Sequence, residues 1–344
     1  MAWIFPVLGR CRGSGSDRVT KGFDRAGDGF HDRFPDADAV AAARSLKLAR
    51  ALYLSGRVPE WLYKIALKLT PSRWYPEPQA YLLKAQIEDH AIQIIHRTDD
   101  TIGREAWLFG YYDRLVLGFL RELVQRLKRA RKDPMVFYDI GANIGNHTVF
   151  LADLFDSIYC FEPNSKALKK LEINVSPFPQ VQIFPIGLSN QDTELGFMTG
   201  SATNLGNAHI VAPEDARASM AKITVRNGDR FIRDENLVPP VLMKIDVEGH
   251  EADAIEGLEA TIAEHTPVIV LEVLARALDK VSPVREMLRA CGYRTFKTSG
   301  LGRARQLTSF RNEIVLTPFD LDESCENAIA IPPCYWNALK DLAT

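Results

Sequence analysis

From Pro134 onward the chain alternates between short apolar runs and segments with a helical pattern, and this alternation limits the fold more than any other feature. The apolar runs are rich in Val, Ile, Phe and Tyr, as in strands that are buried on both faces. The segments between them repeat apolar residues at helical spacing. Repeated β-α-β units form a mostly parallel, doubly wound α/β sheet. The predicted strands are residues 135–140, 157–163, 181–189, 241–247, 267–274, 293–298 and 312–318, and the predicted helices are 148–155, 165–175, 251–265 and 284–292.

The part of the chain before this unit has a helical pattern without strand-like runs. Pro and Gly residues punctuate it at the expected helix starts and ends. The predicted helices are 39–56, 59–71, 76–97 and 105–131.

One segment interrupts the α/β alternation. Residues 195–233 hold short alternating pieces and a polar stretch, and we interpret them as an insertion over one edge of the sheet, a hairpin or a lid. The predicted organisation is a flexible leader at 1–38, a helical region at 39–104, the α/β domain at 105–318 and a C-terminal tail at 319–344.

Charge and composition exclude two classes of protein. With 42 Lys and Arg against 44 Asp and Glu, the net charge is −2, so the chain lacks the positive field that holds nucleic acid. Apolar residues make up 46% of the chain, too many for a disordered protein. We therefore expect a folded protein without a nucleic-acid partner.

The cysteines and the apolar segments indicate a compartment. The 5 Cys are scattered and form no C-x-x-C pair, which argues against a disulfide framework or a zinc knuckle and suits a reducing compartment. The N-terminal MAWIFPVLGR lacks a leading basic residue and is too short for a secretory core. No run of about 18 apolar residues occurs, so we expect a cytoplasmic protein without a transmembrane segment.

The strongest chemical signal is DIGANIGNHT, Asp139 to Thr148, between a predicted strand and a predicted helix. Gly141 and Gly145 allow a tight turn and let a ligand approach the backbone. The following helix offers free N–H groups, and doubly wound folds bind their ligands at this edge of the sheet. The segment predicts a nucleotide-like ligand.

Asp139 favours one such ligand. The dinucleotide fingerprint G-x-G-x-x-G is matched only in part. A carboxylate just before the first glycine repels a pyrophosphate and attracts a cation, such as the ammonium of S-adenosylmethionine (SAM), whose sulfonium is also positive. The alternative is that Asp139 only caps the following turn. We predict that it binds SAM.

Two further strand ends point to the same ligand. Glu162 ends the second strand, where an acidic group hydrogen-bonds ribose hydroxyls in nucleotide-binding folds. NAD would suit Glu162 equally, and a solvent-facing glutamate is the structural alternative. Gly187 and Ser189 end the third strand and are expected to face the adenine edge, although any strand followed by a turn would look the same.

The fourth strand ends in KIDVEGHE, which places several charged groups at the same edge. Asp246, Glu248, His250 and Glu272, the last from the neighbouring strand, are expected to meet there. One interpretation makes them an acid/base or metal constellation, with a general base that deprotonates a hydroxyl. The other makes them structural, with Lys244 paired to a carboxylate and an acidic residue at a helix N-terminus. Because no established metal motif is present, no dedicated metal site is predicted.

These motifs, in this order, resemble those of the FkbM-type SAM-dependent methyltransferase family. The resemblance rests on DIGANIGNHT, FEPN, GLSN, KIDVEGHE and a later strand with EV, and it extends from Tyr111 to Pro318. GYYD, which starts at Gly110, is similar to the family's glycine–tyrosine–acidic motif. The resemblance implies a class I methyltransferase (Rossmann-like) fold of seven strands, the last antiparallel, and residues 312–318 suit an antiparallel edge strand.

The resemblance also implies roles for the site residues. The acceptor side would be lined by Asp246, Glu248 and Glu272, and Asn204 would touch the substrate. SAM would bind through its methionine part to Asp139, Gly141, Asn143 and Gly145 and through its ribose to Glu162.

The predicted function is therefore that of a SAM-dependent O-methyltransferase. The resemblance implies a hydroxyl acceptor on a sugar, lipid or polyketide-type metabolite, deprotonated with the help of a carboxylate or His250. An NAD-dependent oxidoreductase or epimerase stays open as an alternative, as does an inactive binding module. The region 39–104 lies outside the shared core and is a candidate for dimerisation, for capping the site, or for binding a carrier or membrane.

Overall fold

The computed structural model describes residues 80–87, 90–97, 112–198, 209–211, 221–273, 278–300 and 314–342. The predicted leader, the first two predicted helices and Asn204 lie outside these ranges. Within them, no helix combines the length and the apolar character that crossing a membrane requires.

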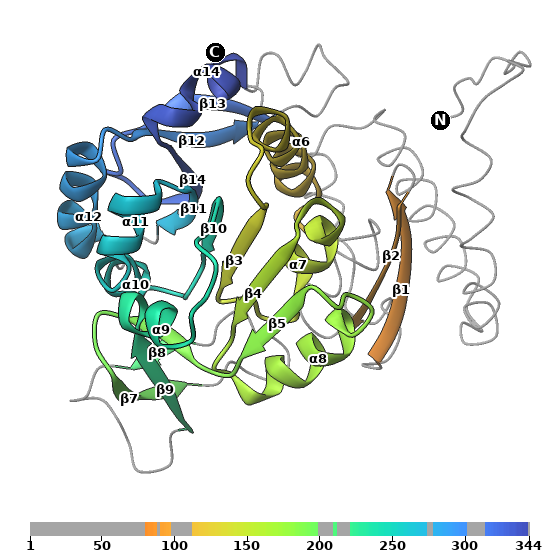
Figure 1. Cartoon of the computed structure of the whole chain (residues 1–344). Coiled ribbons are helices and arrows are strands. Elements are labelled where there is room, and N and C mark those ends of the chain that lie inside the picture. Colours follow the sequence, from red (N-terminus) through yellow and green to blue (C-terminus); the bar gives the residue numbers. More distant parts are fainter. Residues whose placement is uncertain are drawn as a thin grey trace, which may run out of the picture.

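The centre of the molecule is an eight-stranded sheet with the order β13-β12-β14-β11-β10-β3-β4-β5 (Figure 1). From β3 the chain runs outward through β4 and β5, then crosses back to β10 and continues to β11; neighbouring strands among these five are parallel. The order reverses between β3 and β10, so this is a doubly wound sheet with a switch point there, as predicted. The five strands are β3 (Val136–Ile140), β4 (Ser157–Phe161), β5 (Val181–Phe184), β10 (Leu242–Ile245) and β11 (Val268–Val273).

The remaining strands correct the predicted C-terminal tail. β12 (Arg294–Gly300) and β13 (Ile314–Pro318) pair antiparallel, and β13 is an edge strand. β14 (Cys325–Ile331), which the sequence analysis placed in the tail, lies between β11 and β12 and is antiparallel to both. Burial on both faces explains this place, because Ala328 to Ile331 are almost fully inaccessible.

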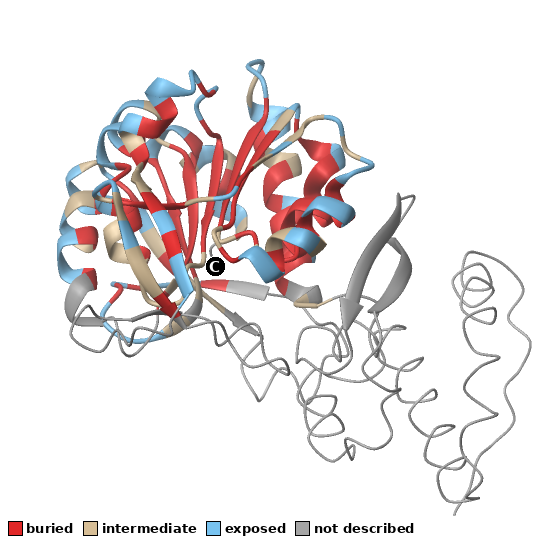
Figure 2. Ribbon diagram, turned by 90° about the horizontal axis from the view of Figure 1, so that it is seen from below, coloured by how far each residue is buried: buried red, intermediate tan, exposed pale blue. Residues whose placement is uncertain are grey.

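Helices cover both faces of the sheet and enclose two cores (Figure 2). Strand alternation divides the side chains between them: Phe137 belongs to one core, and Tyr138 and Ile140 belong to the other. The first core is covered by α6 (Arg114–Ala130), α7 (Asn146–Leu151), α8 (Ser165–Val175) and α14 (Trp336–Leu339), and the second by α10 (Glu251–Glu256), α11 (Glu259–His265) and α12 (Leu278–Ala290).

The predicted helix at 76–97 is wrong. The residues of this range that the structure describes form an antiparallel strand pair, β1 (Ala80–Ile87) and β2 (His90–Arg97), in which Ile87 pairs with His90. The segment is rich in Ile, Leu and Tyr, which also suit strands, and only Glu88 and Asp89 separate the two strands. β2 lies beside α7 and α8.

Two other predicted elements are divided in the structure. The helix predicted at 251–265 is α10 followed by α11, because Asp229 accepts hydrogen bonds from the backbone of Ala260 and Thr261 and starts a second helix. The strand predicted at 181–189 is β5 followed by β6, and these two belong to different sheets. The fourth predicted helix is α6, and the predicted residues 105–111 lie outside the described part.

The predicted insertion forms a second sheet of order β6-β9-β7-β8. Its core is Phe197, Ile223 and Val225, with Leu195 packed against them. β6 lies beside α10, which joins this sheet to the main domain. The elements are β6 (Gly187–Ser189), β7 (Thr193–Met198), β8 (His209–Val211), β9 (Ala221–Asn227) and α9 (Gly228–Asp234).

Candidate functional site

The loop between β3 and α7 lies at the switch point, tightly against the end of β10. Gly141 has φ of +82°, and a Cβ there would lie 1.9 Å from the carbonyl oxygen of Asp246. Gly145 has φ of +85°, and its Cβ would lie 2.7 Å from Leu171 in α8. The loop therefore needs glycine at both positions, for the left-handed backbone and for the close approach.

Asp139 lies beneath this loop and is fully buried. Its Oδ2 accepts a hydrogen bond of 2.7 Å from the hydroxyl of Thr148, while its Oδ1 is buried without a hydrogen-bond partner among the described residues. Burial raises the pKa of Asp139. Lys244, which lies opposite Asp139 on the paired strand β10, carries a positive charge that opposes this shift. The carboxyl group thus keeps one open acceptor atom at the switch point.

Glu162 joins the loop to the end of β4. Its Oε2 accepts from the backbone N–H of Asn143 at 2.7 Å, and its Oε1 accepts from that of Asn164 at 2.8 Å. The residue is buried, which excludes the solvent-facing alternative, and burial raises its pKa to about 7. Glu162 therefore fixes the loop, and Asn143 Oδ1 beside it is buried without a partner in the described structure.

The raised pKa of Glu162 predicts a pH-dependent stability. A carboxyl group whose pKa rises on folding from 4.5 to about 7 binds a proton more tightly in the folded state, so the stability that it contributes is lost as the pH rises through that range. Between pH 4.5 and 7, we expect the free energy of unfolding to fall less in Glu162→Gln than in the unmodified chain, with a difference of up to about 3 kcal/mol. Urea denaturation across this range measures the difference. Parallel pH profiles for the two proteins would contradict it.

Gly187 and Ser189, predicted to face the adenine edge, lie in β6 and not at the end of a main-sheet strand. A Cβ at Gly187 would lie 3.1 Å from Val225 of the paired strand β9. Ser189 is buried, and its Oγ lies 2.9 Å from Nε2 of His250. Gly187 thus lies close against β9, and Ser189 connects the small sheet to His250.

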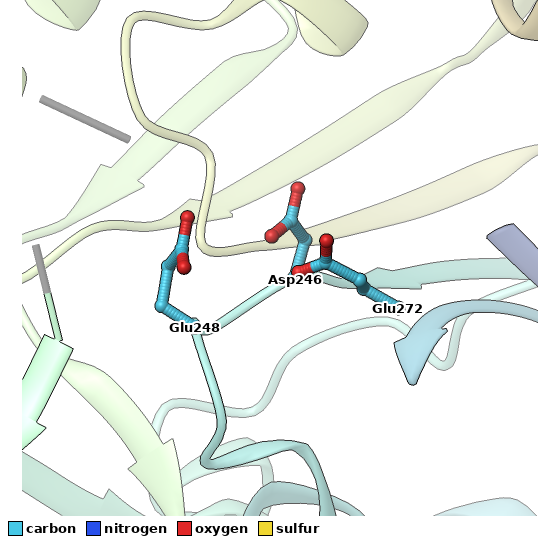
Figure 3. Close-up of side chains that lie close together, drawn as sticks. All are labelled: Asp246, Glu248 and Glu272. Carbon is cyan, nitrogen blue, oxygen red and sulfur yellow. The ribbon is translucent and has the colours of Figure 1, made fainter. Parts of the chain in front are cut away.

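Three of the four predicted catalytic residues come together. Asp246, Glu248 and Glu272 each offer a carboxylate oxygen, and these oxygens lie within 4.8 Å of one another at the ends of β10 and β11 (Figure 3). Lys244 is buried and donates to Asp246 Oδ2 at 2.8 Å. Burial would lower the pKa of Lys244, but Asp246 and Asp139 outweigh it and raise that pKa. Burial and the neighbouring carboxylates raise the pKa of Glu272 to about 8.

The expectation that His250 meets these carboxylates is wrong. His250 directly precedes α10, and its ring is held on the side of β6 between two partners. Nε2 bonds with Ser189, and Nδ1 lies 3.1 Å from Oδ2 of Asp253. His250 thus connects the small sheet to α10.

Replacing His250 with alanine is expected to loosen this junction. Ser189 would lose a buried hydrogen-bond partner, and the free energy of unfolding should fall by about 1–3 kcal/mol, as measured by urea denaturation. His265→Ala, at the end of α11, is the matched control and should change stability by less than about 0.5 kcal/mol. A loss at His250 no larger than at His265 would contradict the junction role.

Two buried residues near the site escaped the sequence analysis as functional groups. His147 in α7 is buried, its Nε2 has no partner in the described structure, and burial together with Lys244 lowers its pKa well below 6.5. Glu251 is the first residue of α10; its Oε1 accepts from the N–H of Val247 and Gly249, while its Oε2 is buried without a hydrogen-bond partner among the described residues. The signal for His147 was its place directly after the glycine loop.

Strand order and site together define the class of the protein. β3, the first strand of the main sheet along the chain, lies inside the sheet and is followed by the glycine loop. The strand order reverses between β3 and β10, and the antiparallel strand β14 lies next to β11, the last strand of the parallel run. This is the class I methyltransferase arrangement, a doubly wound Rossmann-like sheet, with its candidate site at the switch point.

A comparison of sequences relates part of the chain to a known family. Residues 139–295 match the family model described as the methyltransferase FkbM domain. The matched range contains the glycine loop, Glu162 and the three clustered carboxylates.

Curated relatives match part of the chain at low identity. The hexuronic acid methyltransferase AglP of Haloferax volcanii is 27% identical over 152 residues, which cover 44% of this chain and 61% of the relative. The 2-O-methyltransferase NoeI of Sinorhizobium fredii is 24% identical over 160 residues, which cover 42% of this chain and 64% of the relative. The AMB antimetabolite synthetase AmbE of Pseudomonas aeruginosa is 27% identical, with 9% of its length matched. The chain thus spans less than two thirds of each of these relatives.

Solved structures match more loosely. The methyltransferase FkbM from Methylobacillus flagellatus KT is 16% identical, with a TM-score of 0.38, and the match covers 57% of this chain and 43% of that one. The precorrin-6y C5,15-methyltransferase from Geobacter metallireducens is 16% identical, with a TM-score of 0.33, and the match covers 62% of this chain and 85% of that one. The fold assignment therefore rests on the strand order.

Proposed function

We propose that the protein is a SAM-dependent methyltransferase that methylates a hydroxyl group of a sugar, lipid or secondary-metabolite acceptor. The observation that carries this proposal is the buried, unpartnered Oδ1 of Asp139 beneath a glycine loop at the switch point. A buried acceptor without a donor is costly, and the ammonium of SAM would supply the donor.

The residues around the loop fit SAM in two other respects. Asn143 Oδ1 and His147 Nε2 are also buried without partners in the described part of the chain, so the loop and α7 offer further polar atoms to a ligand. The carboxylate of Asp139 would repel the diphosphate of NAD, which disfavours the oxidoreductase alternative. When bound, SAM supplies a methyl group on a positively charged sulfur.

Glu162 supports the cofactor side in two ways. It holds the N–H of Asn143 and so fixes the conformation of the loop. Each of its oxygens accepts one hydrogen bond from the backbone and keeps capacity for a second, so we propose that Glu162 also accepts a ribose hydroxyl. Ser189 has its hydroxyl engaged by His250, so its proposed role is support of the fold beside the site.

The carboxylates of Asp246, Glu248 and Glu272 form the proposed acceptor side. Asp246 and Glu248 follow β10, the strand next to Asp139, and Glu272 lies in the adjoining β11. All three can accept hydrogen bonds from a polyhydroxyl acceptor. Methyl transfer needs an acceptor oxygen held in line with the donor's methyl group, with its proton removed, and positioned carboxylates perform both tasks. The name of one relative, a hexuronic acid methyltransferase, supports a sugar acceptor, and the name of another, a 2-O-methyltransferase, supports methylation of an oxygen.

The proposal is tested in two steps. Thermal unfolding of the full chain is measured with SAM and with NADH, and SAM at about 100 times its Kd should add about 2.7 kcal/mol of stability. SAM with a radiolabelled methyl group is then incubated with the protein and a cell extract, and the label should appear in a hydroxyl-bearing small molecule or glycan. Stabilisation by NADH and not by SAM would refute the proposal. SAM binding without any labelled acceptor would favour an inactive binding module.

A further inference from the structure

The carboxylate cluster carries more negative charge than Lys244 can balance. The ammonium of Lys244 lies 2.8 Å from Asp246, and its charge also acts on Asp139 and Glu272. Within the described part of the chain, Lys244 thus acts on three carboxylates at once, and Glu248 lies close enough to Glu272 to repel it. Such a concentration of like charge at the end of buried strands is costly unless a cation joins it.

A second observation, outside the cluster, also points to a cation. Glu251 is only 3% exposed, and its Oε2 has no hydrogen-bond partner among the described residues. Its Oε1 is bound by Val247 and Gly249, the two residues that flank Glu248, so the carboxylate lies against the loop that carries the cluster. Glu251 also interacts electrostatically with both Asp246 and Glu272. Glu251 is therefore a buried carboxylate next to the cluster, close enough for its charge to act on two of the three members.

We propose that Asp246, Glu248 and Glu272 bind a divalent cation directly, with Glu251 as a positioning residue that accepts a hydrogen bond from a cation-bound water. The donor set is entirely carboxylate oxygen, which suits hard cations such as Mg²⁺ and Mn²⁺. The three side chains lie close together at the ends of β10 and β11 (Figure 3), and three protein ligands leave coordination positions for water or an acceptor.

The cation site also indicates which kind of methyl acceptor would bind, an inference that rests on the proposed function. A cation with open positions binds best to an acceptor with two neighbouring oxygens, such as a vicinal diol or a hydroxy acid, because both oxygens can coordinate. Coordination also lowers the pKa of a hydroxyl group, so its proton leaves more readily to a carboxylate.

The test is a titration of the full, metal-stripped chain with Mn²⁺, with the unbound ion followed by electron paramagnetic resonance. We expect one site, whose affinity falls at least about tenfold in Glu272→Gln and in Glu248→Gln. Glu251→Gln should weaken binding about tenfold through the water that it orients. Glu172→Gln, an exposed position on α8, is the matched control and should bind Mn²⁺ like the unmodified chain. Circular dichroism checks that each variant is folded.

Two results would overturn the cation site: no bound Mn²⁺ in the unmodified chain, or equal affinity in Glu272→Gln, Glu248→Gln and the control. Equal affinity in Glu251→Gln alone would overturn the role of that residue. SAM binding by the same preparations is measured separately by calorimetry. Mn²⁺ binding without SAM binding would support the cation site and refute the proposed function. SAM binding without Mn²⁺ binding would refute the cation site and support the proposed function.

Discussion

An alanine at position 141 is expected to lower the free energy of unfolding by about 3–5 kcal/mol, a large part of the stability of a typical domain. Gly141 has φ of +82°, where a side chain is strained, and its Cβ would lie 1.9 Å from the carbonyl oxygen of Asp246. That oxygen is part of the backbone at the end of β10 and cannot rotate away. Relief of the collision requires the two loops at the switch point to separate, so SAM binding should be lost as well.

Urea denaturation and SAM calorimetry measure both effects. Gly118→Ala is the matched control, because Gly118 lies in α6 with nothing within 4 Å of its added Cβ. Alanine there should stabilise the protein by up to about 1 kcal/mol, since it favours the helix. Similar small effects at Gly141 and Gly118 would show that the loop does not lie as tightly against β10 as described.

The second large effect is expected for Asp139→Asn, which should weaken SAM binding about 30- to 100-fold. Asparagine has nearly the same size and can still accept the hydrogen bond from Thr148, so the variant removes mainly the negative charge. The ammonium of SAM would lose its anionic partner, while Lys244 nearby would keep its positive charge. Calorimetry with SAM measures the change.

Thr148→Val is the control for this variant. It removes the hydroxyl that bonds Asp139 Oδ2 but leaves the carboxylate in place, so SAM binding should weaken less than tenfold. Equal SAM affinity in the unmodified chain and in a folded Asp139→Asn variant would remove Asp139 from the cofactor site.

The sequence was sufficient for the parallel half of the fold because each of its elements carries a local signal. The strands that begin at Val136 and Val268 are nearly continuous apolar runs, and α8 was predicted with the bounds Ser165–Val175 that the structure has. The glycine loop could be identified because tight turns and close approaches need residue types that few other environments require.

The errors arose where local signals conflict with tertiary pairing. β14 has the sequence CENAIAI and follows a stretch of acidic residues, and its small Ala residues have little preference for a strand. It becomes a strand because a gap between β11 and β12 offers partners on both sides. The β1–β2 hairpin was mistaken for a helix because its Leu and Ile residues fit both periods.

The candidate site shows the same division. Asp246 and Glu272 could be brought together from the sequence because parallel strands end at the same edge of the sheet. The place of His250 could not be predicted, because its partner Ser189 is 61 positions away and lies in a sheet that the pattern did not reveal. The open oxygen of Glu251 depends on a loop conformation that no spacing rule describes.

The position of β14 has a consequence for folding during synthesis on the ribosome. β12 and β13 join the parallel half of the sheet only through β14, which lies between them and β11 although it comes after them in the sequence and is the last of the described strands. The outer strands must therefore wait, unattached to the parallel half, until Ile331 has left the exit tunnel. A nascent chain that stalls before β14 would therefore hold two separate fragments of the sheet.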